Sequence, residues 1–127
     1  MLSEELRVIE LIVILGICSA VVFWKMRPVE GIKTITTDEL QTMLRDKDKV
    51  FIDVRSMSDF NKMHVAPFIN DPHGKGIAAL PKDKEIVVIC RSGLRSLETC
   101  KELKKLGYPR ITNVKGGITS YQQRGEL

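Results

Sequence analysis

The hydrophobic residues of the chain follow two different patterns. From Val8 to Trp24 they are almost continuous, with Glu10 as the only charged residue. Spanning a bilayer takes about 20 mainly apolar residues, with ~17 as a lower limit. Beyond residue 31 the apolar residues come in short groups separated by polar segments, which is typical of a folded domain. Residues 1–27 are therefore predicted to form a tail and one transmembrane helix.

A secretory signal peptide, a lipoprotein signal and a buried core helix each fit the apolar run less well. A secretory signal peptide has a positive start and a small residue on either side of the cleavage position. Here the start is acidic, and the run ends in bulky residues up to Trp24. A lipoprotein signal is disfavoured because Ile17, just before Cys18, is too large for the usual motif. A buried core helix would need a polar face, and residues 1–24 show none wide enough.

The basic residues around this run predict its orientation. Arg7 precedes the run, whereas Lys25, Arg27 and Lys33 follow it. Cytoplasmic flanks carry the excess of Lys and Arg, so we expect a single-pass membrane protein whose domain lies in the cytoplasm. The reducing cytosol would also keep a reactive cysteine in its thiol form. A helix lying along the membrane surface is the alternative, because Glu10 shortens the apolar run.

The rest of the chain predicts an α/β domain over residues 32–127, after a linker at residues 28–31 that contains Pro28 and Gly31. The segment 86–89, Ile-Val-Val-Ile, is continuous and β-branched, as central parallel strands tend to be. Strands alternating with helices favour an open parallel sheet flanked by helices. Strands are expected at 32–35, 50–54, 68–69, 85–89 and 111–114, helices at 36–44, after Ser56, at 95–106 and at 118–123, and a loop at 70–82.

Composition excludes several classes of function. The chain has 127 residues and a formal net charge of +4, with 43% hydrophobic and 28% charged residues, as in ordinary globular proteins. Three cysteines and two histidines are too few for a disulfide scaffold or a zinc cluster. The basic residues lack the interleaved aromatic residues of a nucleic-acid surface. We therefore expect no metal, no cofactor and no nucleic-acid partner.

One cysteine stands where a nucleophile would be expected. Cys90 ends the 85–89 strand, and Arg91, Ser92, Gly93 and Leu94 separate it from the next helix. In open parallel sheets, ligands bind beyond the carboxyl ends of the strands. The amide groups of such a turn, the positive end of the helix and the neighbouring arginines all favour thiolate over thiol. The segment therefore predicts a nucleophilic cysteine inside an anion-binding loop.

These residues resemble a known family. The segment 90–96, Cys-Arg-Ser-Gly-Leu-Arg-Ser, is similar to the active-site loop of single-domain rhodaneses, which are sulfurtransferases. The resemblance extends from about Thr34 to Gly125. It includes Ile-Asp-Val-Arg at 52–55, Asp-Phe at 59–60, His-Val at 64–65 and Val-Lys-Gly-Gly-Ile at 114–118. Pro67-Phe68 departs from the usual Gly-Ala, and the 70–82 segment is shorter than usual.

The resemblance implies a membrane-anchored rhodanese that transfers sulfur. Cys90 would take sulfane sulfur from a small donor such as thiosulfate and hold it as a persulfide. It would then pass the sulfur to cyanide or to a thiol, which could belong to an acceptor protein. The loop Arg91, Ser92, Gly93, Leu94 and Arg95 would hold substrate and persulfide. Asp53 and Arg55 would form ion pairs or hydrogen bonds that support the loops, and Ser96 would support them as well.

Two alternative functions stay open for the same residues. A catalytically silent rhodanese-like binding module at the membrane is one, although it would not need Cys90 and Arg95. A phosphatase or arsenate reductase is the second. Cysteine-dependent phosphatases place an Arg after five intervening residues, and Ser96 occupies that position here, whereas Arg95 comes one residue earlier. Cys100 is predicted to be a core residue and His64 a structural one.

Overall fold

The computed structural model describes residues 2–125, in which strands and helices alternate from residue 33 onward. All the strand pairings are parallel, and the strand order is β1-β5-β4-β2-β3. The central position of β4 confirms the prediction from its continuous β-branched run. The strands are β1 (Lys33–Ile35), β2 (Lys49–Asp53), β3 (Ile69–Asn70), β4 (Glu85–Ile89) and β5 (Ile111–Val114).

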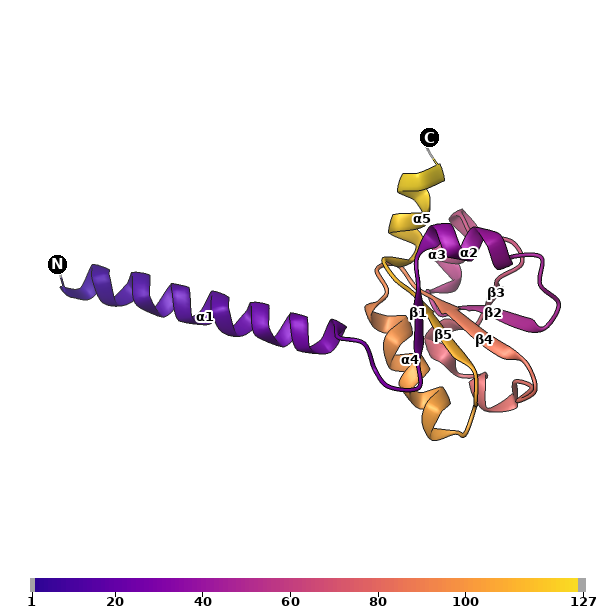
Figure 1. The fold of residues 1–127 in the computed structure, drawn as a ribbon. Helices are drawn as coiled ribbons and strands as arrows, with labels where there is room; N and C mark the ends of the chain where they lie inside the picture. Colours follow the sequence, from indigo (N-terminus) through magenta and orange to yellow (C-terminus); the bar gives the residue numbers. More distant parts are fainter. Residues whose placement is uncertain (1, 126–127) are drawn as a thin grey trace.

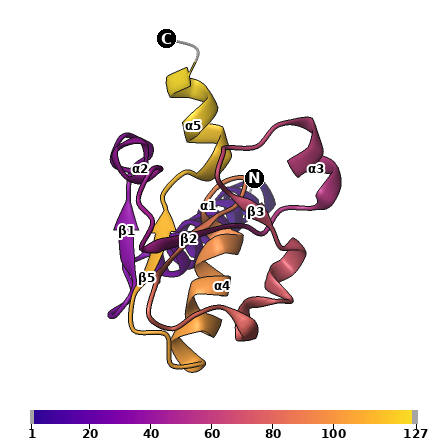
Figure 2. The same ribbon diagram turned by 90° about the vertical axis from the view of Figure 1, so that its right-hand side faces the viewer.

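Helices cover both faces of this sheet. In Figure 2, α2 and α5 lie above the strands and α4 lies below them. The helices are α1 (Leu2–Met26), α2 (Thr37–Met43), α3 (Met57–Lys62), α4 (Leu94–Lys105) and α5 (Gly117–Gly125). The predicted open parallel sheet flanked by helices is thus confirmed, with element ends that differ from the predicted ones by a few residues.

The alternation of side chains along the strands divides the core into two layers. In β4, Ile86 and Val88 pack in the same cluster as Leu97 and Leu103 of α4. The intervening Val87 and Ile89 belong to the opposite cluster, with Leu40 of α2 and Ile118 of α5. Successive side chains of a strand point to opposite faces, so a strand without polar positions must be covered on both sides.

Local signals account for two of the helix starts. The Thr36 hydroxyl accepts the Glu39 N–H and the Glu39 carboxylate accepts the Thr36 N–H, each at 3.2 Å, which forms a capping box before α2. The Ser56 hydroxyl likewise accepts the Asp59 N–H at 3.2 Å and begins α3.

The structure corrects two predicted segments. The strand expected at 68–69 lies one residue later, because Phe68 is buried in the core while Ile69 and Asn70 pair with β2. The segment 70–82 is not a simple loop but contains two short 3-10 helices, η1 (Pro72–Gly74) and η2 (Ile77–Ala79). Buried Tyr108 holds this segment, since its hydroxyl lies 2.7 Å from the carbonyl oxygens of Ile77 and Leu80.

Helix α1 extends away from the α/β domain, as Figure 1 shows. Within Ser3–Lys25, a window of 18 residues has a mean hydropathy of 2.5, and the domain buries none of that window. At about 1.5 Å per residue, a helix of 23 residues is long enough for a hydrocarbon core of about 30 Å. By length and composition, α1 is therefore a helix that could span a membrane.

Candidate active site

Cys90 lies directly after β4, at the carboxyl edge of the sheet where ligands of such folds bind. It is 2% exposed. The turn that follows ends at Gly93, whose φ of 94° is a left-handed conformation that favours glycine. This conformation lets the Gly93 N–H donate to Cys90 Sγ at 3.0 Å. A backbone donor therefore faces the sulfur and stabilises negative charge on it.

A buried polar network holds the turn from the side of β5. The Cys90 thiol donates to Ser96 Oγ at 3.3 Å, and the Ser96 hydroxyl donates to Asn113 Oδ1 at 2.5 Å. The Asn113 amide in turn donates to the Gly93 carbonyl oxygen at 3.2 Å. Ser96 and Asn113 are buried, so water cannot replace a hydrogen-bond partner that either side chain loses. Asn113 thus fixes both the loop backbone and the hydroxyl beside the sulfur.

Replacing Asn113 with leucine is expected to slow the reaction of the Cys90 thiol with an alkylating reagent. The change removes the partners of Gly93 and Ser96, and an unsatisfied buried group costs about 1–3 kcal/mol, or roughly 5-fold to 150-fold if the loss falls on the geometry of the cysteine loop. The measurement is the rate of Cys90 alkylation as a function of pH.

Thr112→Val is the matched control for Asn113→Leu. Thr112 is the preceding residue of β5, is equally buried, and its hydroxyl donates to Glu85 at 3.2 Å, away from the loop. Both variants remove side-chain hydrogen bonds that β5 makes to other segments, one in Thr112→Val and two in Asn113→Leu. Equal rates in the two variants would show that Asn113 only supports the fold.

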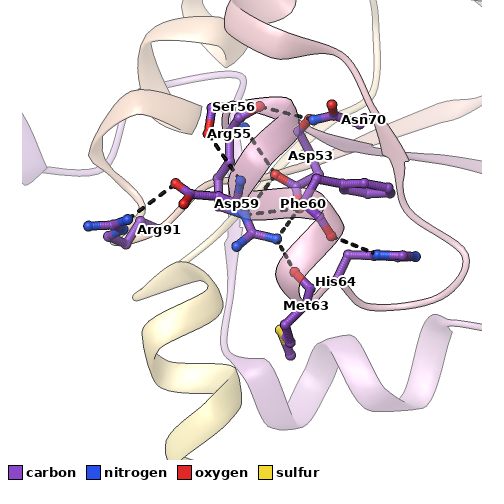
Figure 3. A network of polar contacts seen from close by, with 9 residues as sticks. All are labelled: Asp53, Arg55, Ser56, Asp59, Phe60, Met63, His64, Asn70 and Arg91. Atoms are coloured by element: carbon purple, nitrogen blue, oxygen red, sulfur yellow. Dashed lines mark hydrogen bonds and ion pairs between the residues drawn. The ribbon is translucent and has the colours of Figure 1, made fainter.

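Asp53 and Arg55, which were expected to form ion pairs or hydrogen bonds, form an ion pair with each other. Asp53 is fully buried at the end of β2, and the Arg55 guanidinium donates to its two carboxylate oxygens at 2.8–3.1 Å. Arg55 also donates to the Met63 carbonyl oxygen at 2.7 Å, and Asn70 donates to the backbone oxygens of both Asp53 and Arg55. Figure 3 shows how this network ties β2, α3 and β3 together. Its role as loop support remains a prediction.

Cys90 opens into a polar cavity of about 260 Å³, lined by Arg55, Asp59, Cys90, Arg91, Ser92 and Arg95. Arg91 donates to the Asp59 carboxylate at 3.2 Å, so its charge is partly neutralised (Figure 3). The charge of Arg55 is neutralised by its ion pair with Asp53. Among residues 2–125, Arg95 forms no ion pair, which leaves its guanidinium available for an anion at the cavity mouth.

The structure does not bring Leu94 to this cavity. Leu94 is the first residue of α4, is 41% exposed, and lines a separate cavity with Ser92, Gly93 and Lys115. The predicted loop Arg91, Ser92, Gly93, Leu94 and Arg95 therefore faces two directions. Arg91, Ser92 and Arg95 border Cys90, Gly93 reaches it through its N–H, and the Leu94 side chain points elsewhere.

The beginning of α5 packs directly on the cysteine loop. The N–H groups of Ile118 and Thr119 donate to the carbonyl oxygens of Cys90 and Arg91 at 2.8 and 3.0 Å. Gly117, with a φ of 57°, leaves no room for a side chain, because an added Cβ would lie 2.2 Å from the Cys90 carbonyl oxygen. Sequence patterns alone predicted neither this contact nor the Asn113 network nor the Arg91–Asp59 pair.

The other candidate residues lie outside this site. The His64 ring stacks on Phe60, with 3.8 Å between centroids, and its Nδ1 lies 2.9 Å from the Phe60 carbonyl oxygen, as expected of a structural histidine. Burial raises the pKa of the Cys100 thiol to about 12, with a smaller contribution from Cys90, so Cys100 is a poor nucleophile. Within residues 2–125, His, Cys, Asp and Glu form no group of three that could hold a metal ion.

The fold and the site define an open parallel α/β protein with a buried cysteine whose sulfur accepts a loop amide. Known proteins of similar sequence have the same class of fold. The sequence model of the rhodanese-like domain matches residues 36–124. The chain belongs to the rhodanese-like domain family. The predicted family is thereby confirmed for the α/β part of the chain.

Relatives of the chain carry sulfurtransferase names. It is 34% identical over 95 residues to a putative sulfurtransferase of Bacillus subtilis, covering 72% of this chain and 91% of the relative. It is 29% identical over 105 residues to a sulfurtransferase of Allochromatium vinosum, covering 74% and 92%. Among solved structures, a rhodanese-related protein from Thermoplasma volcanium is 29% identical with a TM-score of 0.65, covering 73% and 93%. These relatives place the chain in a sulfurtransferase family.

Proposed function

We propose that the protein is a sulfurtransferase that carries sulfane sulfur as a persulfide on Cys90. The observation that carries the proposal is the position of Cys90 Sγ, which accepts the Gly93 N–H inside a cavity bordered by the Arg95 guanidinium. The sulfurtransferases of similar sequence support the same class of reaction. The physiological donor is a small anion or thiol that carries a sulfane sulfur, with thiosulfate as the laboratory donor.

The first half of the reaction loads the enzyme. The Cys90 thiolate attacks the outer sulfur of thiosulfate, a new S–S bond forms, and the S–S bond of thiosulfate breaks. The electron pair of the broken bond leaves with sulfite, and the terminal sulfur on Cys90 keeps the negative charge. Arg95 holds the anionic donor at the cavity mouth, and the Gly93 amide stabilises charge on the cysteine sulfur.

The second half of the reaction transfers the sulfur. Cyanide or an acceptor thiolate attacks the terminal sulfur of the persulfide and forms a bond to it. The S–S bond of the persulfide breaks, and its electron pair returns to Cys90 as thiolate. The products are thiocyanate or the persulfide of the acceptor, and the reaction needs neither a metal nor an outside reductant.

The mass of the intact protein after thiosulfate treatment tests this proposal. We expect the wild-type chain to gain one sulfur atom, Cys90→Ser to gain none, and the sulfur to leave on addition of cyanide. Cys100→Ser and Cys18→Ser are matched controls, because Cys100 is buried with a raised pKa and Cys18 lies in α1. The absence of a gain in the wild type, or an equal gain in Cys90→Ser, would contradict the proposal.

We further propose that residues 1–27 anchor the protein in a membrane through α1, that residues 28–31 are a linker, and that the domain from residue 32 to 127 lies in the cytoplasm. The apolar length of α1 supports the anchor. Lys25, Arg27 and Lys33 at its carboxyl-terminal side support the orientation.

Labelling of a cysteine introduced at Lys47 tests the orientation. Lys47 is exposed in the turn between α2 and β2, so a thiol there reacts without unfolding. In a Cys18→Ser, Cys90→Ser background, we expect a membrane-impermeant maleimide to label Lys47→Cys in lysed cells and not in intact cells. Equal labelling in both would place the domain on the outside.

A further inference from the structure

The linker holds the domain close to the end of α1. Helix α1 ends at Met26, and Val29 already packs against the core cluster on the α4 face. The Ile32 N–H donates to the Val29 carbonyl oxygen at 3.1 Å, which fixes the turn that enters the domain. Only Arg27 and Pro28 remain between the helix and the fixed part of the chain. Three extended residue steps span at most about 10 Å, so the domain cannot move far from the end of the helix.

The side of the domain nearest to α1 carries the cysteine loop. Arg27 and Pro28 line one cavity together with Ser92, Leu94 and Lys115. Lys115 also lines a cavity with residues of the last turns of α1, namely Cys18, Ser19, Val22 and Phe23. Figure 1 shows α1 running outward from this side, while the turn between α2 and β2 lies on the opposite side.

This side is positively charged. We call Arg27, Leu94 and Lys115, together with Arg91 and Arg95 of the adjoining cavity, the loop face. All five residues are exposed, and the Arg91 side chain is 73% exposed. Asp59 partly neutralises Arg91, whereas Arg27, Arg95 and Lys115 form no ion pair among the described residues. Leu94, 41% exposed, adds an apolar side chain between the cations.

We propose that the loop face docks on anionic lipid headgroups of the membrane that holds α1. The short linker places this face next to the headgroup layer, and cations near an anionic membrane surface each favour binding by several-fold. The Arg27 guanidinium lies 4.9 Å from the centroid of the Trp24 ring, and tryptophan is typical of this interfacial layer. The charge and the apolar Leu94 side chain match such a surface.

Docking of the loop face has a consequence for sulfur transfer. Ser92 lines both the cavity formed with Arg27, Leu94 and Lys115 and the cavity of Cys90, so the two cavities are adjacent. A sulfur donor or acceptor would then reach Cys90 from the headgroup layer. The docking proposal rests on the proposed membrane anchor but not on the sulfurtransferase reaction.

Fluorescence quenching by spin-labelled lipid headgroups tests the docking. The full chain carries a bimane label on Lys115→Cys at the loop face or on Lys47→Cys on the far side, each in a Cys18→Ser, Cys90→Ser background. Cys100 is left in place, since burial raises its pKa to about 12. Each protein is reconstituted in vesicles of phosphatidylcholine alone, or of phosphatidylcholine and phosphatidylglycerol in equal parts.

We expect position 115 to be quenched at least about 2-fold more strongly than position 47 in the anionic vesicles, with the difference reduced in neutral vesicles and at high salt, where the attraction is screened. Equal quenching at the two positions in anionic vesicles would overturn the docking. A chain that fails to float with either vesicle would overturn the anchor and the docking together. Sulfur loading is measured by mass on the wild-type chain in detergent and does not depend on either outcome, so failure of the catalytic proposal is seen separately.

Discussion

Replacing Arg55 with leucine is expected to lower the free energy of unfolding by about 3–5 kcal/mol, because it leaves the buried Asp53 carboxylate without its cation. Asp53 is fully buried, and the Arg55 Nη2 lies 2.8 Å from its Oδ2. The change also removes the donor to the Met63 carbonyl oxygen, which holds the end of α3. Urea unfolding of the full chain in mild detergent, followed by circular dichroism, measures the loss.

Two variants serve as controls for Arg55→Leu. The double variant Asp53→Leu, Arg55→Leu removes both charges and is expected to regain part of the stability, because no unpaired charge stays buried. Arg91→Leu breaks the exposed pair with Asp59, and exposed pairs contribute about 0–1 kcal/mol. A loss for Arg55→Leu no larger than that for Arg91→Leu would contradict the assignment of the Asp53–Arg55 pair as the support of this edge of the sheet.

Replacing Gly117 with alanine is expected to reduce sulfur loading of Cys90 by on the order of 100-fold. The added Cβ would lie 2.2 Å from the Cys90 carbonyl oxygen and 2.7 Å from the carbonyl carbon of Arg91, so the loop or α5 must move. A displacement of about 1 Å at a reacting group can cost about 100-fold in rate. Alkylation and persulfide formation on the intact protein measure the effect.

Gly107→Ala is the matched control for Gly117→Ala. Gly107 also has a positive φ, 89°, but an added Cβ there would meet only the Lys82 side chain at 3.6 Å. Both variants therefore carry a left-handed alanine, which costs roughly 1–2 kcal/mol, and only Gly117→Ala also pushes on the cysteine loop. Equal sulfur loading in the two variants would show that the contact between α5 and the loop does not position Cys90.

The position of Cys90 directly after a buried strand could be predicted from the sequence because its signals are local. The run Ile86–Ile89 is continuous and β-branched, and Cys90 and Gly93 follow it within a few residues. The caps at Thr36 and Ser56 are also local, since each joins residues three positions apart. The pair of Asp53 with Arg55 is also local, since it spans two positions.

Contacts between distant segments were not predictable in this way. Asn113 lies 17 residues from Ser96, and Arg91 lies 32 residues from Asp59. Each contact exists because two strands that are neighbours in the sheet, β4 and β5 for Asn113 or β2 and β4 for Asp59, are separated by a long connection in the sequence. The 3-10 helix η2 in the 70–82 segment is held in the same way by Tyr108, which is 31 residues from Ile77.

By itself, the sequence determined an apolar N-terminal helix, an alternation of strands and helices, and a cysteine at the end of a buried strand, because hydrophobic periodicity and turn residues act over a few positions. The tertiary structure alone decided which side chains surround Cys90 and which way its loop faces. The order β1-β5-β4-β2-β3 places Asn113 of β5 beside the loop after β4, and the packing of α5 on that loop excludes a side chain at Gly117. The tertiary structure also places Leu94 in a cavity with Arg27 and not in the cavity of Cys90, a relation that no local pattern contains.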